Sequence, residues 1–171
     1  MAWLAFTKRA QIKNISLQEL KFLFRTLEMT SGVPAIFWHD PYAVGFVCGY
    51  IMAVGICVNH GAAPKSWDIT LATNDILAEL VPNDLMATAE RMAQWRQTND
   101  PEYNLGNTNG AKLAFFVLRK IAANTPEVIE AKRRAGEQSA IFDSLQIMDT
   151  EKRVSSVLHG MLFFDRIRKL K

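Results

Sequence analysis

The sequence predicts an all-α fold, a single compact bundle-like domain of six or seven helices that spans residues 1–171. Three observations predict it. Apolar residues recur at helical spacing between recognisable helix caps, no segment alternates convincingly between apolar and polar residues as a strand does, and residues 41–58 form one uncharged apolar segment. With 49% hydrophobic and 22% charged residues, the chain has the composition of a globular protein rather than a disordered one.

The first predicted helix begins at Ser16. Ser16 and Glu19 have the spacing of a capping box, in which each side chain bonds to a free backbone amide of the first turn. Leucines follow at helical spacing, and Gly32 and Pro34 end the helix.

The apolar segment is predicted to be the central helix of the bundle. Asp40 is its cap, Pro41 occupies the first helical position, and the helix runs to about Val58. At about 27 Å it is at the short edge of what crosses a bilayer. Since a third of its residues are Gly, Ala or Pro, we favour a buried core helix, covered by amphipathic helices, over a membrane span.

Two helices and a loop are expected next. A helix starts near Trp67 and ends before Pro82, and Asn83 or Asp84 caps another. Residues 98–110 are dense in Asn, Gly, Asp and Thr, which predicts a long loop, and a helix over residues 111–124 follows it.

The last part of the chain is predicted to hold two helices. Thr125 and Pro126 open one that extends over residues 127–148, and Asp149 or Thr150 caps one that extends to the C-terminus.

The two cysteines, Cys48 and Cys57, both lie in the predicted central helix. Nine residues apart, they are separated by about 13 Å along the axis, which excludes a disulfide between them. Buried unpaired thiols are typical of a reducing compartment, so we expect a cytoplasmic protein.

The sequence offers few candidates for catalysis. His39 with Asp40 resembles part of a metal site, but the central helix holds His60 roughly 30 Å away. Ser155 and His159 have the spacing of a pair on one helix face, without a nucleophile elbow around them. We therefore expect no catalytic site, no bound metal and no cofactor.

Charge is unevenly distributed, although the net charge is only +3. Residues 30–110 carry three basic and eight acidic residues, whereas residues 111–171 carry twelve basic and seven acidic ones. One hypothesis is therefore a nucleic-acid-binding accessory protein that uses basic residues of the last helices. Its candidate residues are Arg119, Lys120, Lys132, Arg133, Arg134, Arg166, Arg168 and Lys169.

The favoured hypothesis is a protein-binding module of the regulatory or inhibitory adaptor type, without a catalytic site. The last helix has more apolar residues than one buried stripe needs, which predicts self-association through it as a homodimer or other homo-oligomer. The interface candidates are Leu162, Phe163 and Arg166 of the last helix, Trp3 and Phe6 near the N-terminus, and Tyr103 in the predicted loop. A third hypothesis is an enzyme whose site is assembled from scattered residues such as Glu28, Asp100 and His159.

Overall fold

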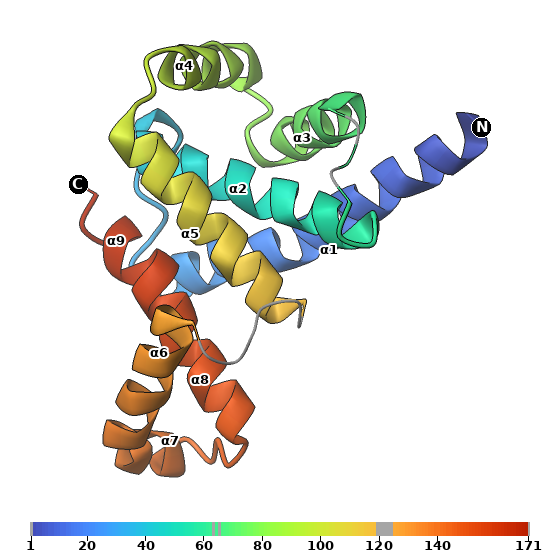
Figure 1. The fold of residues 1–171 in the computed structure, drawn as a ribbon. Helices are drawn as coiled ribbons and strands as arrows, with labels where there is room; N and C mark the ends of the chain where they lie inside the picture. The colour runs from blue at the N-terminus through green and yellow to red at the C-terminus, as the bar shows by residue number, and fades with distance from the viewer. Residues whose placement is uncertain (1, 63, 65, 119–124, 171) are drawn as a thin grey trace.

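The computed structural model describes the backbone of residues 2–62, 64, 66–118 and 125–170, and the side chains of these residues from Lys8 on, except that of residue 66. Every regular element in this part of the chain is helical, which confirms the all-α fold (Figure 1). The elements are α1 (Ala2–Thr30), the 3-10 helix η1 (Phe37–His39), α2 (Pro41–Val58), α3 (Ser66–Leu80), α4 (Leu85–Gln97), α5 (Pro101–Val117), α6 (Pro126–Glu137), α7 (Ser139–Ser144), α8 (Thr150–His159), the π-helix η2 (Gly160–Phe164) and α9 (Asp165–Ile167).

Helix α1 is longer than predicted. The predicted cap, Ser16, lies in its interior, where its buried hydroxyl has no hydrogen-bond partner. The helix starts earlier because its buried stripe already includes Ile12. Its end is as predicted: the amides of Ser31 and Gly32 both bond to the carbonyl oxygen of Leu27, and Gly32 has the positive φ, +76°, that glycine adopts easily.

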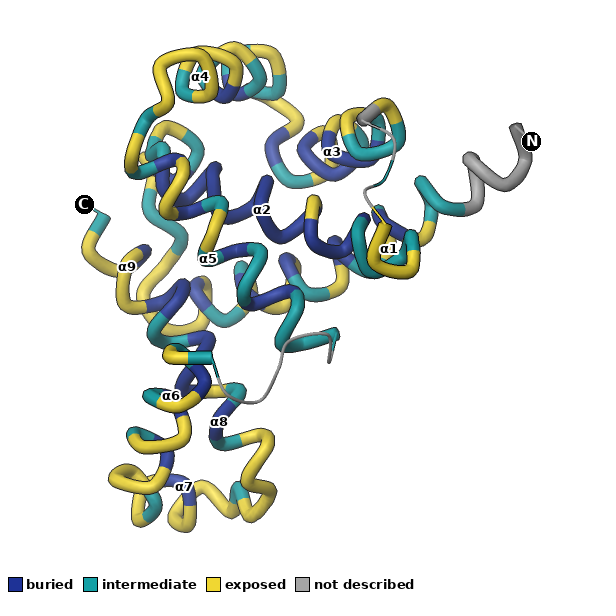
Figure 2. Tube along the Cα trace, in the orientation of Figure 1, coloured by how far each residue is buried: buried dark blue, intermediate teal, exposed yellow. Residues whose placement is uncertain are grey.

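Helix α2 is the centre of the fold, with the predicted bounds. The Asp40 carboxylate accepts a hydrogen bond from the amide of Ala43, and Pro41 begins the helix. Its length and composition suit a membrane span, but 72% of it is buried inside the protein (Figure 2). This burial is that of a core helix covered by its neighbours.

The predicted loop over residues 98–110 is instead largely helical. Asp100 caps α5 by accepting a hydrogen bond from the amide of Tyr103, and Pro101 occupies the first position. This start repeats the Asp-Pro start of α2. The glycines that suggested a loop, Gly106 and Gly110, lie inside the helix and are both buried.

Helices α2 and α5 pack backbone against backbone. A Cβ atom added to Gly45 or Gly49 would collide with the carbonyl oxygen of Tyr103 or Asn107, respectively. Gly45 meets Tyr103, and Gly49, four residues later, meets Asn107, four residues after Tyr103. The two helices therefore run in the same direction. Such close approach is what pairs of small residues four apart permit.

The contact is reciprocal. A Cβ atom added to Gly106 would meet the carbonyl oxygen of Tyr42, and one added to Gly110 would meet that of Phe46. Each helix therefore presents two glycines and two carbonyl groups to the other. Because the two helices are parallel, the chain must return between them, and α3 and α4 form this return (Figure 1).

The end of the chain crosses the core as α8, η2 and α9. Leu162 and Phe163 are buried there, at 5% and 1% exposed. The ring of Phe163 lies 4.7 Å from that of Phe46 and 5.3 Å from that of Phe164. The prediction that Leu162 and Phe163 form an intermolecular contact is therefore wrong, because their apolar surface packs within the chain.

A hydrogen-bonded tyrosine joins the π-helix to the helix pair. The Tyr42 hydroxyl donates to the carbonyl oxygen of Leu162 at 2.8 Å and accepts from the Asn109 amide nitrogen at 2.9 Å. A π-turn disrupts the regular α-helical bonding pattern. Tyr42 supplies a donor at this point and connects α2, α5 and η2.

The predicted helix over residues 127–148 is interrupted. Helix α6 ends at Glu137, and the short α7 begins after Gln138. Together with α8 these helices form a lobe at the end of the molecule away from α3 and α4 (Figure 1).

The glycine contact predicts opposite effects for two matched substitutions. Gly49→Ala is expected to lower the free energy of unfolding by about 1–3 kcal/mol, because the methyl group would force α2 and α5 apart. Gly136→Ala in α6 has no atom near its new methyl group, so it is expected to leave stability unchanged or raise it by up to about 1 kcal/mol. Urea unfolding of both variants measures the difference, and equal effects would contradict the contact.

Candidate functional site

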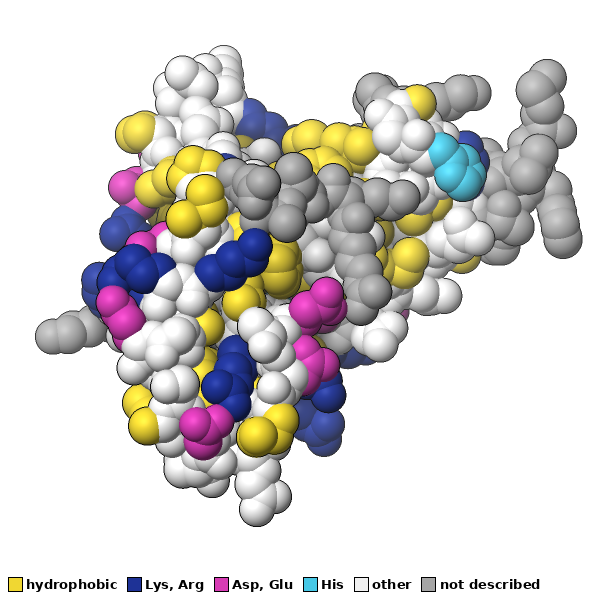
Figure 3. Space-filling view, turned by 60° about the horizontal axis from the view of Figure 1, so that its bottom comes forward, with side chains coloured by type: hydrophobic (Ala, Val, Ile, Leu, Met, Phe, Trp, Pro, Cys, Tyr) yellow, Lys and Arg dark blue, Asp and Glu magenta, His cyan; other side chains and the backbone are white. Residues whose placement is uncertain are grey.

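A groove of about 1030 Å³ opens between α1, the end of α5, α6 and α8. Figure 3 looks onto the α6–α8 end of the molecule, where apolar side chains are visible between charged ones. Aromatic and branched aliphatic side chains line much of the groove, namely Phe22, Phe116, Val117, Val128, Val154 and Phe164. Charged side chains also line it, namely Glu19, Lys132, Asp149, Glu151, Lys152 and Arg168.

A histidine–glutamate pair lies in the wall of this groove. His159 of α8 is 8% exposed, and its Nε2 atom lies 2.8 Å from Oε1 of Glu19 on α1. Its Nδ1 atom lies 2.7 Å from the carbonyl oxygen of Ser155. The ring of Phe22 meets the imidazole edge-on at 6.1 Å between centroids. The pair therefore links two helices whose contacting residues are far apart in sequence.

The bonding pattern shows what this pair can do chemically. The Ser155 hydroxyl lies 3.4 Å from Nδ1 of His159, so a hydroxyl, an imidazole and a carboxylate follow one another. However, both ring nitrogens face oxygen acceptors, and the doubly protonated ring is the form that donates to both. A nitrogen that donates to the Ser155 carbonyl group does not accept a proton from the hydroxyl. In this arrangement Nδ1 of His159 faces a carbonyl acceptor and is not placed to act as a general base for the Ser155 hydroxyl.

The other residues of the scattered-enzyme hypothesis lie elsewhere. Asp100 caps α5, and Glu28 is exposed near the end of α1. Neither lines the groove with His159. His39 lies 3.9 Å from Asp84, and no group of three potential metal-binding side chains occurs among the described residues.

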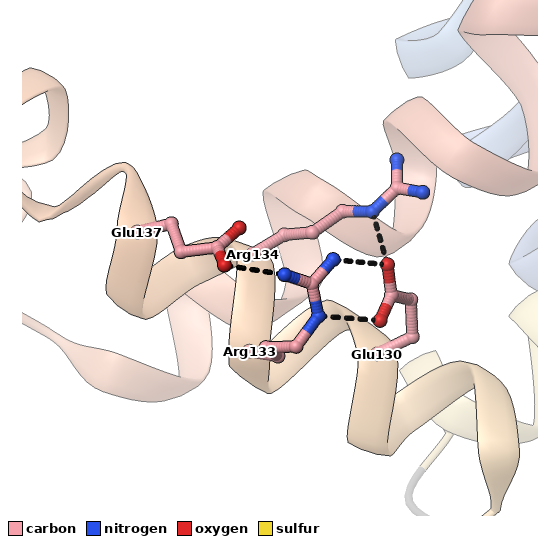
Figure 4. Close-up of polar contacts among 4 residues, drawn as sticks. All are labelled: Glu130, Arg133, Arg134 and Glu137. Carbon is pink, nitrogen blue, oxygen red and sulfur yellow. Dashed lines mark hydrogen bonds and ion pairs between the residues drawn. The ribbon is translucent and has the colours of Figure 1, made fainter.

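The two arginines of α6 pair with carboxylates of the same helix (Figure 4). Arg133 pairs with Glu130 and Glu137, and Arg134 also pairs with Glu130. The two guanidinium groups lower the pKa of Glu130 to about 2, and hydrogen bonding to Glu130 raises the pKa of Arg133. These contacts occupy the groups that would bind phosphate.

The remaining nucleic-acid candidates are divided between two places. Lys132 and Arg168 both line the groove, and Arg168 also lies over the ring of Phe164, 5.5 Å from its centroid. Arg166 pairs with Glu102 and lies over the ring of Tyr42, and Lys169 is exposed. Arg119 and Lys120 lie outside the described residues.

The interface candidates are also placed differently from expectation. Tyr103 is 2% exposed and lies on α5, where it packs against α4, rather than in a recognition loop. The side chains of Trp3 and Phe6 lie outside the described part of the chain. Phe22 was not among the residues predicted from the sequence, and it is 54% exposed although it lies in an apolar segment. The sequence contains a sign of this exposure, because Phe22 lies off the helix face that Leu20, Leu23 and Leu27 form and bury.

Neither cysteine forms a disulfide, and the two differ in burial. Cys48 is 3% exposed, and this burial raises the pKa of its thiol. Cys57 is only half-buried and lines a smaller hollow of about 330 Å³ with His60. The expectation of two buried thiols is therefore correct for Cys48 alone.

Comparisons with known proteins give no relative for this chain. No protein-family model, no curated protein and no solved structure matches it.

The His159–Glu19 pair is expected to contribute more to stability than the exposed ion pairs of α6. His159→Ala leaves the Glu19 carboxylate in the groove wall without its donor, which is expected to lower the free energy of unfolding by about 1–3 kcal/mol. Arg133→Ala removes an exposed partner and is expected to change unfolding little. Urea unfolding of both variants measures this difference. If His159→Ala behaved like Arg133→Ala, the pair would not stabilise the junction of α1 and α8.

Proposed function

We propose that this protein is a protein-binding module and that the groove between α1, α5, α6 and α8 receives a short apolar segment of a partner protein. The observation that carries this proposal is Phe22. Phe22 is more than half exposed at the edge of an apolar groove. A partner that covers its ring removes apolar surface from water, which contributes favourably to the free energy of binding.

The size and lining of the groove favour a protein segment over a small ligand. Pockets for small molecules commonly measure about 300–1000 Å³, and this groove is at the upper limit of that range. Its charged residues have both signs, including Glu151, Lys152 and Arg168. An apolar centre with a polar rim of both signs is typical of protein interfaces.

A regulatory or inhibitory adaptor that acts in the cytoplasm, without a cofactor or a catalytic step, is the form of module we propose. Two cysteines that form no disulfide are compatible with a reducing compartment. Self-association stays a prediction of the sequence, and it would need a face other than the buried Leu162 and Phe163. The nucleic-acid hypothesis has less support, because carboxylates already pair with Arg133, Arg134 and Arg166.

A random-peptide display library tests the groove with a defined probe. Peptides with an apolar core are expected to be selected on the wild-type protein, and Phe22→Glu is expected to weaken their binding at least about tenfold, because it places a charge against the apolar segment. Met29→Glu is the matched control, since Met29 is on the same helix, is 80% exposed and does not line the groove. Fluorescence anisotropy measures the affinities, and circular dichroism checks that both variants fold.

Two outcomes would overturn this proposal. The library could yield no specific peptide, or the selected peptides could bind Phe22→Glu as tightly as wild type. The second outcome would direct attention to a different face of the protein.

A further inference from the structure

Helix α4 is attached to the fold by few side chains. Of its thirteen residues, Thr88 and Met92 are buried, whereas α2 buries thirteen of eighteen. In Figure 2 α4 is coloured mainly as exposed or intermediate, and in Figure 1 it stands on the side of α2 away from the groove. No residue of α4 lines the proposed binding groove, so a movement of α4 does not alter the groove directly.

The contacts that hold α4 lie along one edge. The Met92 sulfur is 3.9 Å from the Cys48 sulfur on α2, and Nε of Arg96 donates to the Tyr103 hydroxyl on α5 at 2.8 Å. The ring of Trp95 lies 6.0 Å from that of Tyr103. Two buried side chains, two partly buried ones (Leu85 and Trp95) and one hydrogen bond to α5 therefore hold α4, which is a small fraction of the packing that stabilises the core.

Both ends of α4 carry backbone features that suit a hinge. The chain turns through Pro82 and Asn83 before the helix, and Asn99 after it has a positive φ of 53°. The linking segments, residues 81–84 and 98–100, lie outside the helices, so a rotation of α4 changes backbone angles there and leaves α3 and α5 wound.

The surface beneath α4 is a continuous strip of the core. Cys48 and Met52 are four residues apart and so lie on the same face of α2. Cys48 is 3% exposed under α4, whereas Met52, beyond the cover, is 39% exposed. The Tyr103 side chain on α5 adjoins the Cys48 thiol, and both contact α4, Tyr103 through Arg96 and Cys48 through Met92.

We infer that α4 is a detachable cover, which leaves α2 and α5 while the rest of the protein stays folded. Its departure uncovers Cys48 and Tyr103, which together with the already exposed Met52 form one strip. The physical reason is that segments with few buried apolar contacts open at a lower free energy than the core does. The opened strip is a second apolar surface, separate from the groove, and its availability depends on the position of α4.

The native-state reactivity of Cys48 measures this opening directly. A small thiol reagent modifies Cys48 only when α4 is displaced, and peptide mass spectrometry separates its modification from that of Cys57. The expected rate is slow but nearly independent of low urea concentrations, because local opening exposes little surface. Met92→Ala is expected to accelerate the modification at least about tenfold, because it removes the buried anchor of α4.

Leu23→Ala is the matched control. Leu23 is fully buried on α1, so its truncation destabilises the whole fold without touching the attachment of α4. It is expected to lower the melting temperature at least as much as Met92→Ala does and to leave the Cys48 rate unchanged.

Equal acceleration by the two variants, or a rate that rises steeply with urea, would overturn the inference, because Cys48 would then react only on global unfolding. Hydrogen exchange of the wild-type protein gives a second test that needs no variant. The amides of α4 are expected to exchange faster than those of α2 and α5, and equal protection would contradict a detachable α4.

Discussion

The fold depends on the contact between two pairs of glycines and four carbonyl groups. Gly45 and Gly49 of α2 lie against carbonyl oxygens of α5, and Gly106 and Gly110 of α5 lie against carbonyl oxygens of α2. At each position an α-hydrogen takes the place of a side chain, so weak Cα–H···O contacts replace side-chain packing. Because the two helices are parallel and this close, α3 and α4 must return the chain, and α8 with η2 can pack across the pair.

The groove is a consequence of this arrangement. The last helix is positioned by the Tyr42 hydroxyl and by the packing of Phe163 on Phe46, both anchored on α2. With α8 fixed in this way, His159 reaches Glu19 of α1 and closes one wall. The exposed ring of Phe22 lies beside this pair. The site thus combines residues from opposite ends of the chain. Its geometry depends on the close packing of α2 against α5, which positions the last helix.

Local signals predicted much of the fold. The Asp-Pro start located α2, and Thr125 and Asp149 cap α6 and α8 as predicted. Asp84 occupies the N-cap position of α4, but its carboxylate binds Arg91 and makes no capping bond to a backbone amide. The same Asp-Pro signal at Asp100 was outweighed by the glycines and asparagines that follow, because glycine inside a helix is normally costly. Here the cost is offset by close packing against α2, which depends on residues distant in sequence. The Glu19–His159 pair could not be predicted for the same reason, and the surplus apolar surface of the last helix proved to be internal.

Nuclear Overhauser effects between α-protons measure the central contact most directly. The arrangement predicts strong cross-peaks between the α-protons of Gly45 and Tyr103 and between those of Gly49 and Asn107, since the backbones of α2 and α5 touch at both positions. Side chains packed between two helices would hold their axes about 8–10 Å apart and remove these cross-peaks. Their presence at both positions is the result expected, and their absence from a well-resolved spectrum would contradict the account.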